Sequence, residues 1–108
     1  MQFIEKIHQV IEENLDNSDF NIDTIASTIG LSRSAFFKKL KSLTGFAPVD
    51  LVKEIRLNKS IELIKNSDMS ISEIAFAVGF KDSGYFSKCF RKKYDQTPRE
   101  YMNEWRKS

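Results

Sequence analysis

The sequence predicts an all-α protein of seven helices, in which two helix-turn-helix subdomains are joined by a central linker helix. Three observations predict this fold class. Apolar residues recur at helical spacing, and no segment alternates like a strand. Glycine, proline and capping residues lie where short helices would begin or end. One pattern is also written twice, about half the chain apart.

The repeated pattern consists of an apolar pair, a glycine turn, a stripe of aromatic and basic residues, and a proline. The first copy contains Ile25-Ala26, Ile29-Gly30-Leu31, Phe36, Lys38, Leu40-Lys41 and Pro48; the second contains Ile74-Ala75, Val78-Gly79-Phe80, Phe86, Lys88, Phe90-Arg91 and Pro98. The offset is 49 residues up to the glycine and 50 after it, so the second turn carries one inserted residue. A short helix, a glycine turn and a helix with a basic outer face are typical of the helix-turn-helix.

The first half of the chain is expected to form three helices, over residues 2–15, 22–29 and 33–43. The first has one apolar face, formed by Ile4, Ile7, Val10, Ile11 and Leu15. Asn21 and Ser32 are the expected N-caps of the next two. Gly30 supplies the turn between them, and Gly45 closes the third.

The second half repeats this plan after a longer helix over residues 48–65, with proline at its first position. Ser70 and Glu73 form a capping box that opens a helix over 71–78. Gly79 turns the chain, Asp82 caps a helix over 83–93, and Thr97-Pro98 opens the last helix. Tyr101 and Trp105 on that helix are expected to cover the second core.

The central helix is apolar on different sides at its two ends. Leu51, Val52 and Ile55 lie on one side, whereas Leu57, Ile61 and Ile64 lie on a largely opposite side. Such a helix is expected to bury each end against a different body and to act as a rigid spacer about 27 Å long. The expected division is a first lobe over residues 1–47, a linker helix over 48–65 and a second lobe over 66–108.

Composition excludes several classes of protein. The one cysteine rules out an internal disulfide and a cysteine-built zinc site, and one histidine cannot build a metal site. No apolar run reaches the length of a membrane span, and the N-terminus does not resemble a signal peptide, so a cytoplasmic location is expected. An enzyme is disfavoured, since the chain has no Cys–His pair and no phosphate-binding glycine loop. No cofactor and no metal are expected.

The distribution of charge points to a polyanionic partner, although the net charge is only +2. Residues 1–23 contain one basic and six acidic residues, whereas residues 33–44 contain four basic residues and no acidic one. Residues 80–94 contain five basic residues and one acidic residue. A single basic cluster is usually a solvated helix face. Two clusters at equivalent positions of a repeat favour nucleic acid.

The second helix of each repeat is expected to turn one face inward and offer the other to DNA. Phe36, Leu40 and Leu43 form the inward stripe of the first, and Phe86, Cys89, Phe90 and Tyr94 that of the second. The residues expected to read bases are Arg33, Ser34, Phe37, Lys38, Ser83, Gly84, Tyr85, Ser87 and Lys88. The residues expected to contact phosphates are Lys41, Lys81, Arg91 and Lys92.

Several of these roles have open alternatives. Lys38 and Lys88 can reach guanine or a phosphate, and the serines and Tyr85 can bond to either bases or phosphates. Phe37 can press on thymine methyl groups or fold back between the lobes. Cys89 is expected in the core and His8 at the surface or its boundary.

These motifs resemble the AraC-type transcription regulators over residues 5–105. The resemblance is most specific in Ile71-Ser72-Glu73-Ile74-Ala75, Val78-Gly79-Phe80, Tyr85-Phe86-Ser87-Lys88, Phe90-Arg91-Lys92 and Thr97-Pro98, and Ile55-Arg56-Leu57 also matches. Asp95 stands where the family usually has glycine, and Phe37 where a polar base-reading residue is common. Leu31-Ser32-Arg33-Ser34 and residues 39–45 resemble modules that end hybrid two-component sensors.

The resemblance implies a sequence-specific regulator that binds double-stranded DNA with two recognition helices in successive major grooves. The isolated module is expected to be a monomer, and a sensor or dimerisation part commonly precedes such modules in the family. The competing hypothesis is a helical protein-interaction module whose basic faces dock acidic partners such as RNA polymerase.

Overall fold

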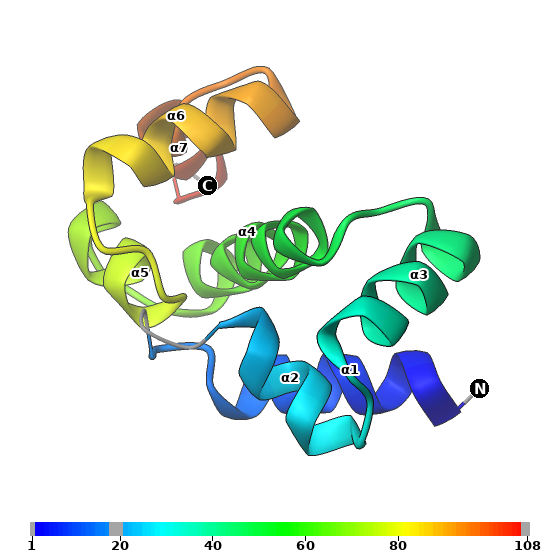
Figure 1. The fold of residues 1–108 in the computed structure, drawn as a ribbon. Coiled ribbons are helices and arrows are strands. Elements are labelled where there is room, and N and C mark those ends of the chain that lie inside the picture. The colour runs from blue at the N-terminus through cyan, green and yellow to red at the C-terminus, as the bar shows by residue number, and fades with distance from the viewer. Residues whose placement is uncertain (1, 18–20, 107–108) are drawn as a thin grey trace. The chain divides into compact units, whose positions relative to one another are not determined.

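The computed structural model describes residues 2–17 and 21–106 and has seven α-helices within them. Their bounds are α1 Gln2–Glu13, α2 Ile22–Ile29, α3 Arg33–Thr44, α4 Pro48–Asn66, α5 Ile71–Ala77, α6 Ser83–Tyr94 and α7 Pro98–Arg106 (Figure 1). The all-α prediction is confirmed, and each predicted helix end lies within two residues of the observed one. None of the described helices is long and apolar enough to cross a membrane.

The described chain forms two compact units, and the boundary between them lies inside α4. α1, α2, α3 and α4 up to Ile55 belong to the first unit; α4 from Arg56, together with α5, α6 and α7, belongs to the second. The buried residues of α4 divide in the same way: Leu51 and Ile55 lie in the first unit, and Leu57 and Ile64 in the second. The assignment of a separate linker over residues 48–65 stays a prediction.

The core of the first unit is formed by one face of each of its helices. α2 packs against both α1 and α3. The buried apolar side chains are Ile7, Val10, Ile11, Leu15, Ile25, Ala26, Phe36, Leu40, Leu51 and Ile55. At the start of α1, the ring centroids of Phe3 and Phe36 are 6.2 Å apart. The Lys39 ammonium lies over the ring of Phe3, 4.4 Å from its centroid. Lys39 is thereby held beside α1.

The prediction that Leu43 faces the core of the first unit is wrong. Leu43 has the helical spacing of Phe36 and Leu40, yet it is 51% exposed, whereas both of those side chains are fully buried. The spacing fixes the side of α3 on which Leu43 lies. It does not supply a neighbouring element to cover the last turn, and none covers Leu43 in the described structure.

The second unit is held together by a row of aromatic rings along α6. The ring of Phe86 lies edge-on to that of Phe80, with 5.2 Å between the centroids. The centroids of Phe86 and Phe90 are 5.8 Å apart, and those of Phe90 and Tyr94 are 4.6 Å apart. Tyr101 of α7 meets Phe90 edge-on at 5.8 Å, as expected of a residue covering the core. Trp105 differs from the expectation, because it is 49% exposed and instead receives the Lys65 ammonium at 4.6 Å. Cys89 is buried, as predicted, and in the first unit His8 is exposed, also as predicted.

Candidate nucleic-acid interface

The helix turns of the two repeats close with the same hydrogen bonds. Gly30 and Gly79 both adopt positive φ, at 88° and 94°, as a left-handed turn requires. The amide after each glycine donates to a carbonyl five residues back, from Leu31 to Ala26 at 2.9 Å and from Phe80 to Ala75 at 2.9 Å. This is the Schellman closure, which fixes how the next helix leaves the turn. The predicted glycine turns are confirmed.

The second helix of each repeat begins at a side-chain cap, as predicted. The Ser32 hydroxyl accepts the amide of Ala35 at 3.1 Å. The Asp82 carboxylate accepts the amides of Gly84 at 2.6 Å and Tyr85 at 3.2 Å. Both caps satisfy amides that would otherwise lack partners, and they fix the first turn of α3 and of α6.

The first-unit residues predicted to touch DNA lie together on the outer face of α3. The members of this first stripe are all exposed: Arg33, Ser34, Phe37, Lys38 and Lys41. Four of them, Arg33, Ser34, Phe37 and Lys38, line a shallow open hollow. Phe37 is 46% exposed, which favours a ring available to a ligand.

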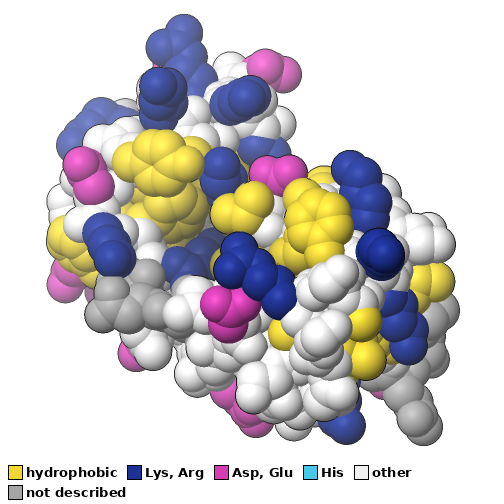
Figure 2. Space-filling view, viewed as in Figure 1, with side chains coloured by type: hydrophobic (Ala, Val, Ile, Leu, Met, Phe, Trp, Pro, Cys, Tyr) yellow, Lys and Arg dark blue, Asp and Glu magenta, His cyan; other side chains and the backbone are white. Residues whose placement is uncertain are grey.

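The second-unit residues lie on α6 and just before it. The exposed members of this second stripe are Lys81, Gly84, Tyr85, Lys88, Arg91 and Lys92, whereas Ser83 and Ser87 are half-buried at its margins. Tyr85 is 51% exposed, and its ring lies 6.0 Å from that of buried Phe80. Figure 2 shows Lys and Arg side chains gathered over α3 and over α6, with hydrophobic side chains beside them in each case. Their roles at bases or phosphates stay predictions.

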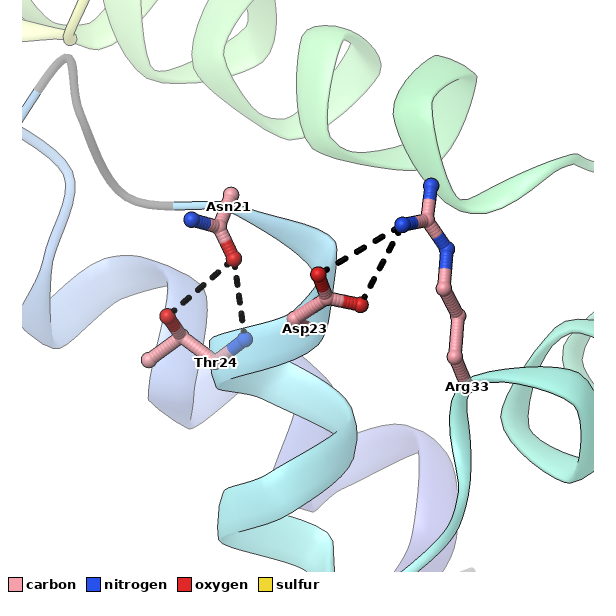
Figure 3. A network of polar contacts seen from close by, with 4 residues as sticks. All are labelled: Asn21, Asp23, Thr24 and Arg33. Carbon is pink, nitrogen blue, oxygen red and sulfur yellow. Dashed lines mark hydrogen bonds and ion pairs between the residues drawn. The ribbon is translucent and has the colours of Figure 1, made fainter.

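One acidic residue, Asp23 of α2, lies beside the first stripe in a contact that the sequence did not predict. Arg33 Nη1 lies 3.4 Å from both carboxylate oxygens of Asp23, which is in the first turn of α2 (Figure 3). Nothing in the sequence indicates this pair, because the residues are ten positions apart on different helices.

A buried arginine supports the second turn. Arg56 of α4 is 8% exposed, and its guanidinium donates to the carbonyl of Gly79 and, at 3.3 Å, to that of Asn17. Burial lowers the pKa of the Arg56 guanidinium from its ordinary value. Arg56 thus connects the central helix to the residue that turns the chain between α5 and α6. In the sequence, Arg56 stands out only as part of the Ile55-Arg56-Leu57 motif.

The comparisons with known proteins agree with this geometry. Residues 25–104 match the model of a family described as a helix-turn-helix domain. The chain is 38% identical over 96% of its length to histidine kinase P4 of Formosa agariphila, of which it covers 8%. The match to the C-terminal domain of the two-component response regulator yesN of Fusobacterium nucleatum has a TM-score of 0.84 at 29% identity and covers 94% of this chain and 99% of that one.

A second similar structure contains nucleic acid. The DNA-binding domain of AdpA, a global transcriptional factor, was solved in complex with a target DNA; it has a TM-score of 0.86 at 28% identity, and the match covers 96% of this chain and 92% of that domain. The chain belongs to the AraC-type helix-turn-helix family. It is therefore a DNA-binding domain of the transcription-regulator class, and the expectation that it is not an enzyme is confirmed.

The AraC-type domain is a small part of its curated relatives. It spans less than a third of the length of the two that it matches. Asp95, which stands where the family usually has glycine, adopts positive φ at 63°, and its counterpart in the first unit is Gly45 at 79°. The backbone at this position is thus left-handed in both repeats, which explains the glycine preference.

Proposed function

We propose that the AraC-type domain recognises a specific duplex sequence by inserting α3 and α6 into successive major grooves. The observation that carries the proposal is the correspondence of the two stripes. Lys38 and Lys88 are exposed at equivalent positions, as are Lys41 and Arg91, on helices that begin at side-chain caps. Grooves on one side of a duplex repeat about every 34 Å, so the proposed site spans roughly two turns.

The two stripes differ in their other residues, and the proposed site is therefore asymmetric. Arg33, Ser34, Phe37 and Lys38 would read bases in one groove, and Ser83, Gly84, Tyr85, Ser87 and Lys88 in the other. The cations further along or outside each helix, Lys41, Lys81, Arg91 and Lys92, would bind phosphates and fix the register. In this proposal α4 is the rigid spacer between the two readers.

The whole protein is proposed to be a longer cytoplasmic regulator of the two-component type. Its support is the similarity to a histidine kinase and to the C-terminal domain of a response regulator. We propose that the isolated domain is a monomer and that any dimerisation resides in the rest of the protein. RNA polymerase is the proposed protein partner, and the exposed apolar side chains of Leu43, Phe46 and Val49 are the candidate contacts in the first unit.

Competition binding tests the proposal against a purely electrostatic attraction. A labelled duplex containing the preferred site is titrated with the domain in the presence of excess random DNA, at several salt concentrations. Sequence-specific binding should persist under competition by random DNA while it weakens steeply with salt. Equal displacement by random DNA would reject sequence recognition, and insensitivity to salt would favour the protein-interaction hypothesis.

A further inference from the structure

We propose that Asp23 is a positioning residue that holds Arg33 so that one edge of its guanidinium can bind guanine in the major groove. The inference rests on the proposed function and deepens it, because it concerns how the first stripe reads a base. Asp23 places a carboxylate beside the first stripe, where DNA binding alone would not favour one.

The main chain at Asp23 is fixed by a cap. Asn21 Oδ1 accepts the amide of Thr24 at 3.1 Å and its hydroxyl at 3.3 Å (Figure 3). Asp23 therefore lies in an ordered first turn of α2, where a negative charge also interacts favourably with the helix dipole. The position of its carboxylate is thus set by α2 and not by α3.

Asp23 engages one end of the Arg33 guanidinium only. Both contacts, each 3.4 Å long, go to Nη1. No described residue bonds to the Nε and Nη2 edge. An Nε and Nη2 edge offers two parallel N–H groups, the geometry that matches O6 and N7 of guanine. Asp23 thereby restricts Arg33 without occupying the edge that would read the base.

The surrounding charge makes this carboxylate unusual. Residues 24–49 contain no aspartate or glutamate, so Asp23 borders a stretch whose charged residues are all basic. A carboxylate there repels phosphates and lowers affinity for any DNA. The second repeat has Ser72 and Ser83 at the equivalent positions and lacks the pair. A residue that opposes binding in general while orienting a base reader is expected to increase specificity.

The pair contributes little to folding, which makes it testable. The side chains of Arg33 and Asp23 are 71% and 63% exposed, and exposed ion pairs rarely stabilise a protein measurably. Asp23→Asn keeps the shape of the side chain and removes its charge. The thermal unfolding of the variant should differ from that of the wild type only by the small helix-dipole contribution of Asp23.

The experiment measures base preference at each position of the selected site, using duplexes with single base changes. The position read by Arg33 is identified as the one whose preference is lost in Arg33→Met. At that position, Asp23→Asn should reduce the preference for guanine about two- to fivefold, the range expected for an exposed ion pair. Affinity for random DNA should rise at the same time. Asp23→Glu, which retains a carboxylate, should restore most of the preference.

Two controls separate positioning from a general change of charge. Asp50→Asn removes the same charge from an exposed residue in the first turn of α4 and should leave the base preference unchanged. In the Arg33→Met background, Asp23→Asn should have no further effect on preference at that position.

The outcomes distinguish the inference from the function on which it rests. A wild-type domain without sequence preference would overturn both. A specific wild type whose preference is unaltered by Asp23→Asn, or weakened equally at every position, would overturn the role of Asp23 alone. An effect of Asp23→Asn that persists without Arg33 would do the same.

Discussion

Lys88 shows how a single exposed side chain can separate base reading from phosphate binding. It lies in the second turn of α6, whereas Lys92 lies one turn further along the same helix. Lys88→Ala should weaken binding to the preferred site by about 1–3 kcal/mol and relax the preference at one position. Lys92→Ala, the matched control, should weaken binding to all sequences similarly and make the salt dependence shallower. Fluorescence anisotropy on site and random duplexes measures both effects; a uniform loss for Lys88→Ala would assign it to phosphate.

Asp95 and Gly45 form a reciprocal pair for testing backbone strain. Each of these residues follows a helix and has left-handed φ, a backbone conformation that residues other than glycine adopt at a cost in free energy. Asp95→Gly should stabilise the second unit by about 0.5–1 kcal/mol, and Gly45→Asp should destabilise the first by a similar amount. An added Cβ at Gly45 meets nothing within 4 Å, so the cost there is that of the backbone. Urea unfolding measures the change; destabilisation by Asp95→Gly would contradict this explanation.

Arg56 is expected to contribute to stability, because it is a buried side chain that donates to two backbone carbonyls. Arg56→Ala removes the donor to the buried carbonyl of Gly79 and to the partly buried carbonyl of Asn17, and this loss should cost about 1–3 kcal/mol. Arg56→Lys retains the charge without the fork of donors and should fall between the alanine variant and the wild type. Urea unfolding of the three proteins measures this order. A wild-type midpoint for Arg56→Ala would show that the turn does not depend on the buried arginine.

At the scale of elements, capping boxes make part of the stability depend on pH. Glu73 accepts the backbone amide of Ser70 at 2.8 Å, and Glu100 accepts that of Thr97 at 2.8 Å. The hydrogen bonds from these backbone amides lower the pKa of each carboxyl, and hydrogen bonding with the side chains of Ser70 and Thr97 lowers it further. A carboxyl whose pKa is lower in the folded state stabilises the fold above its unfolded pKa, about 4.3, and loses that contribution as pH falls through the folded pKa.

Replacement of both carboxyls tests this linkage. Glu73→Gln/Glu100→Gln should flatten the loss of stability below about pH 4.3, because neither position then titrates. Glu104→Gln, on an exposed part of α7, is the control for removal of a carboxylate. Urea unfolding between neutral and acidic pH gives the comparison. Acid-side slopes that coincide in the double variant and the wild type would exclude a contribution from the caps.

Local signals explain how much of the fold was predictable. The caps at Asn21, Ser32, Ser70 and Asp82 act within three residues of themselves, so the sequence is sufficient to place helix starts. Thr97 and Glu100 also form a capping box, whose T-x-x-E spacing is equivalent to that of Ser70 and Glu73. The helix start there is predicted from the sequence, but the box is not. The exposure of Leu43 depends on what covers a helix end, which spacing does not encode.

The exposure of the candidate interface residues was predictable from helical periodicity, whereas their contacts with residues distant in sequence were not. The exposed stripe positions on α3 and α6 follow from the turn and the spacing, and all but two half-buried serines are exposed. The pairing of Asp23 with Arg33 and that of Arg56 with Gly79 join different helices. Neither has a local pattern, since both arise from tertiary packing.

At the scale of the whole molecule, the chain is a duplication whose two copies have diverged. The two units share their turns and caps and differ in the residues that their second helices expose. The shared turns close with the same hydrogen bonds and fix how the second helix of each repeat leaves the turn. Divergence of the exposed residues would let one chain read two different half-sites, with no need for a second subunit.

The most direct test of this account is selection of bound sequences from a random duplex pool by the isolated domain. The account predicts a preferred site of roughly two helical turns, with two unlike blocks of preferred bases about 10 base pairs apart. Lys38→Ala should weaken the preference in one block and Lys88→Ala that in the other. Recovery of a single short block, or of no preferred sequence, would contradict the claim that both α3 and α6 read DNA.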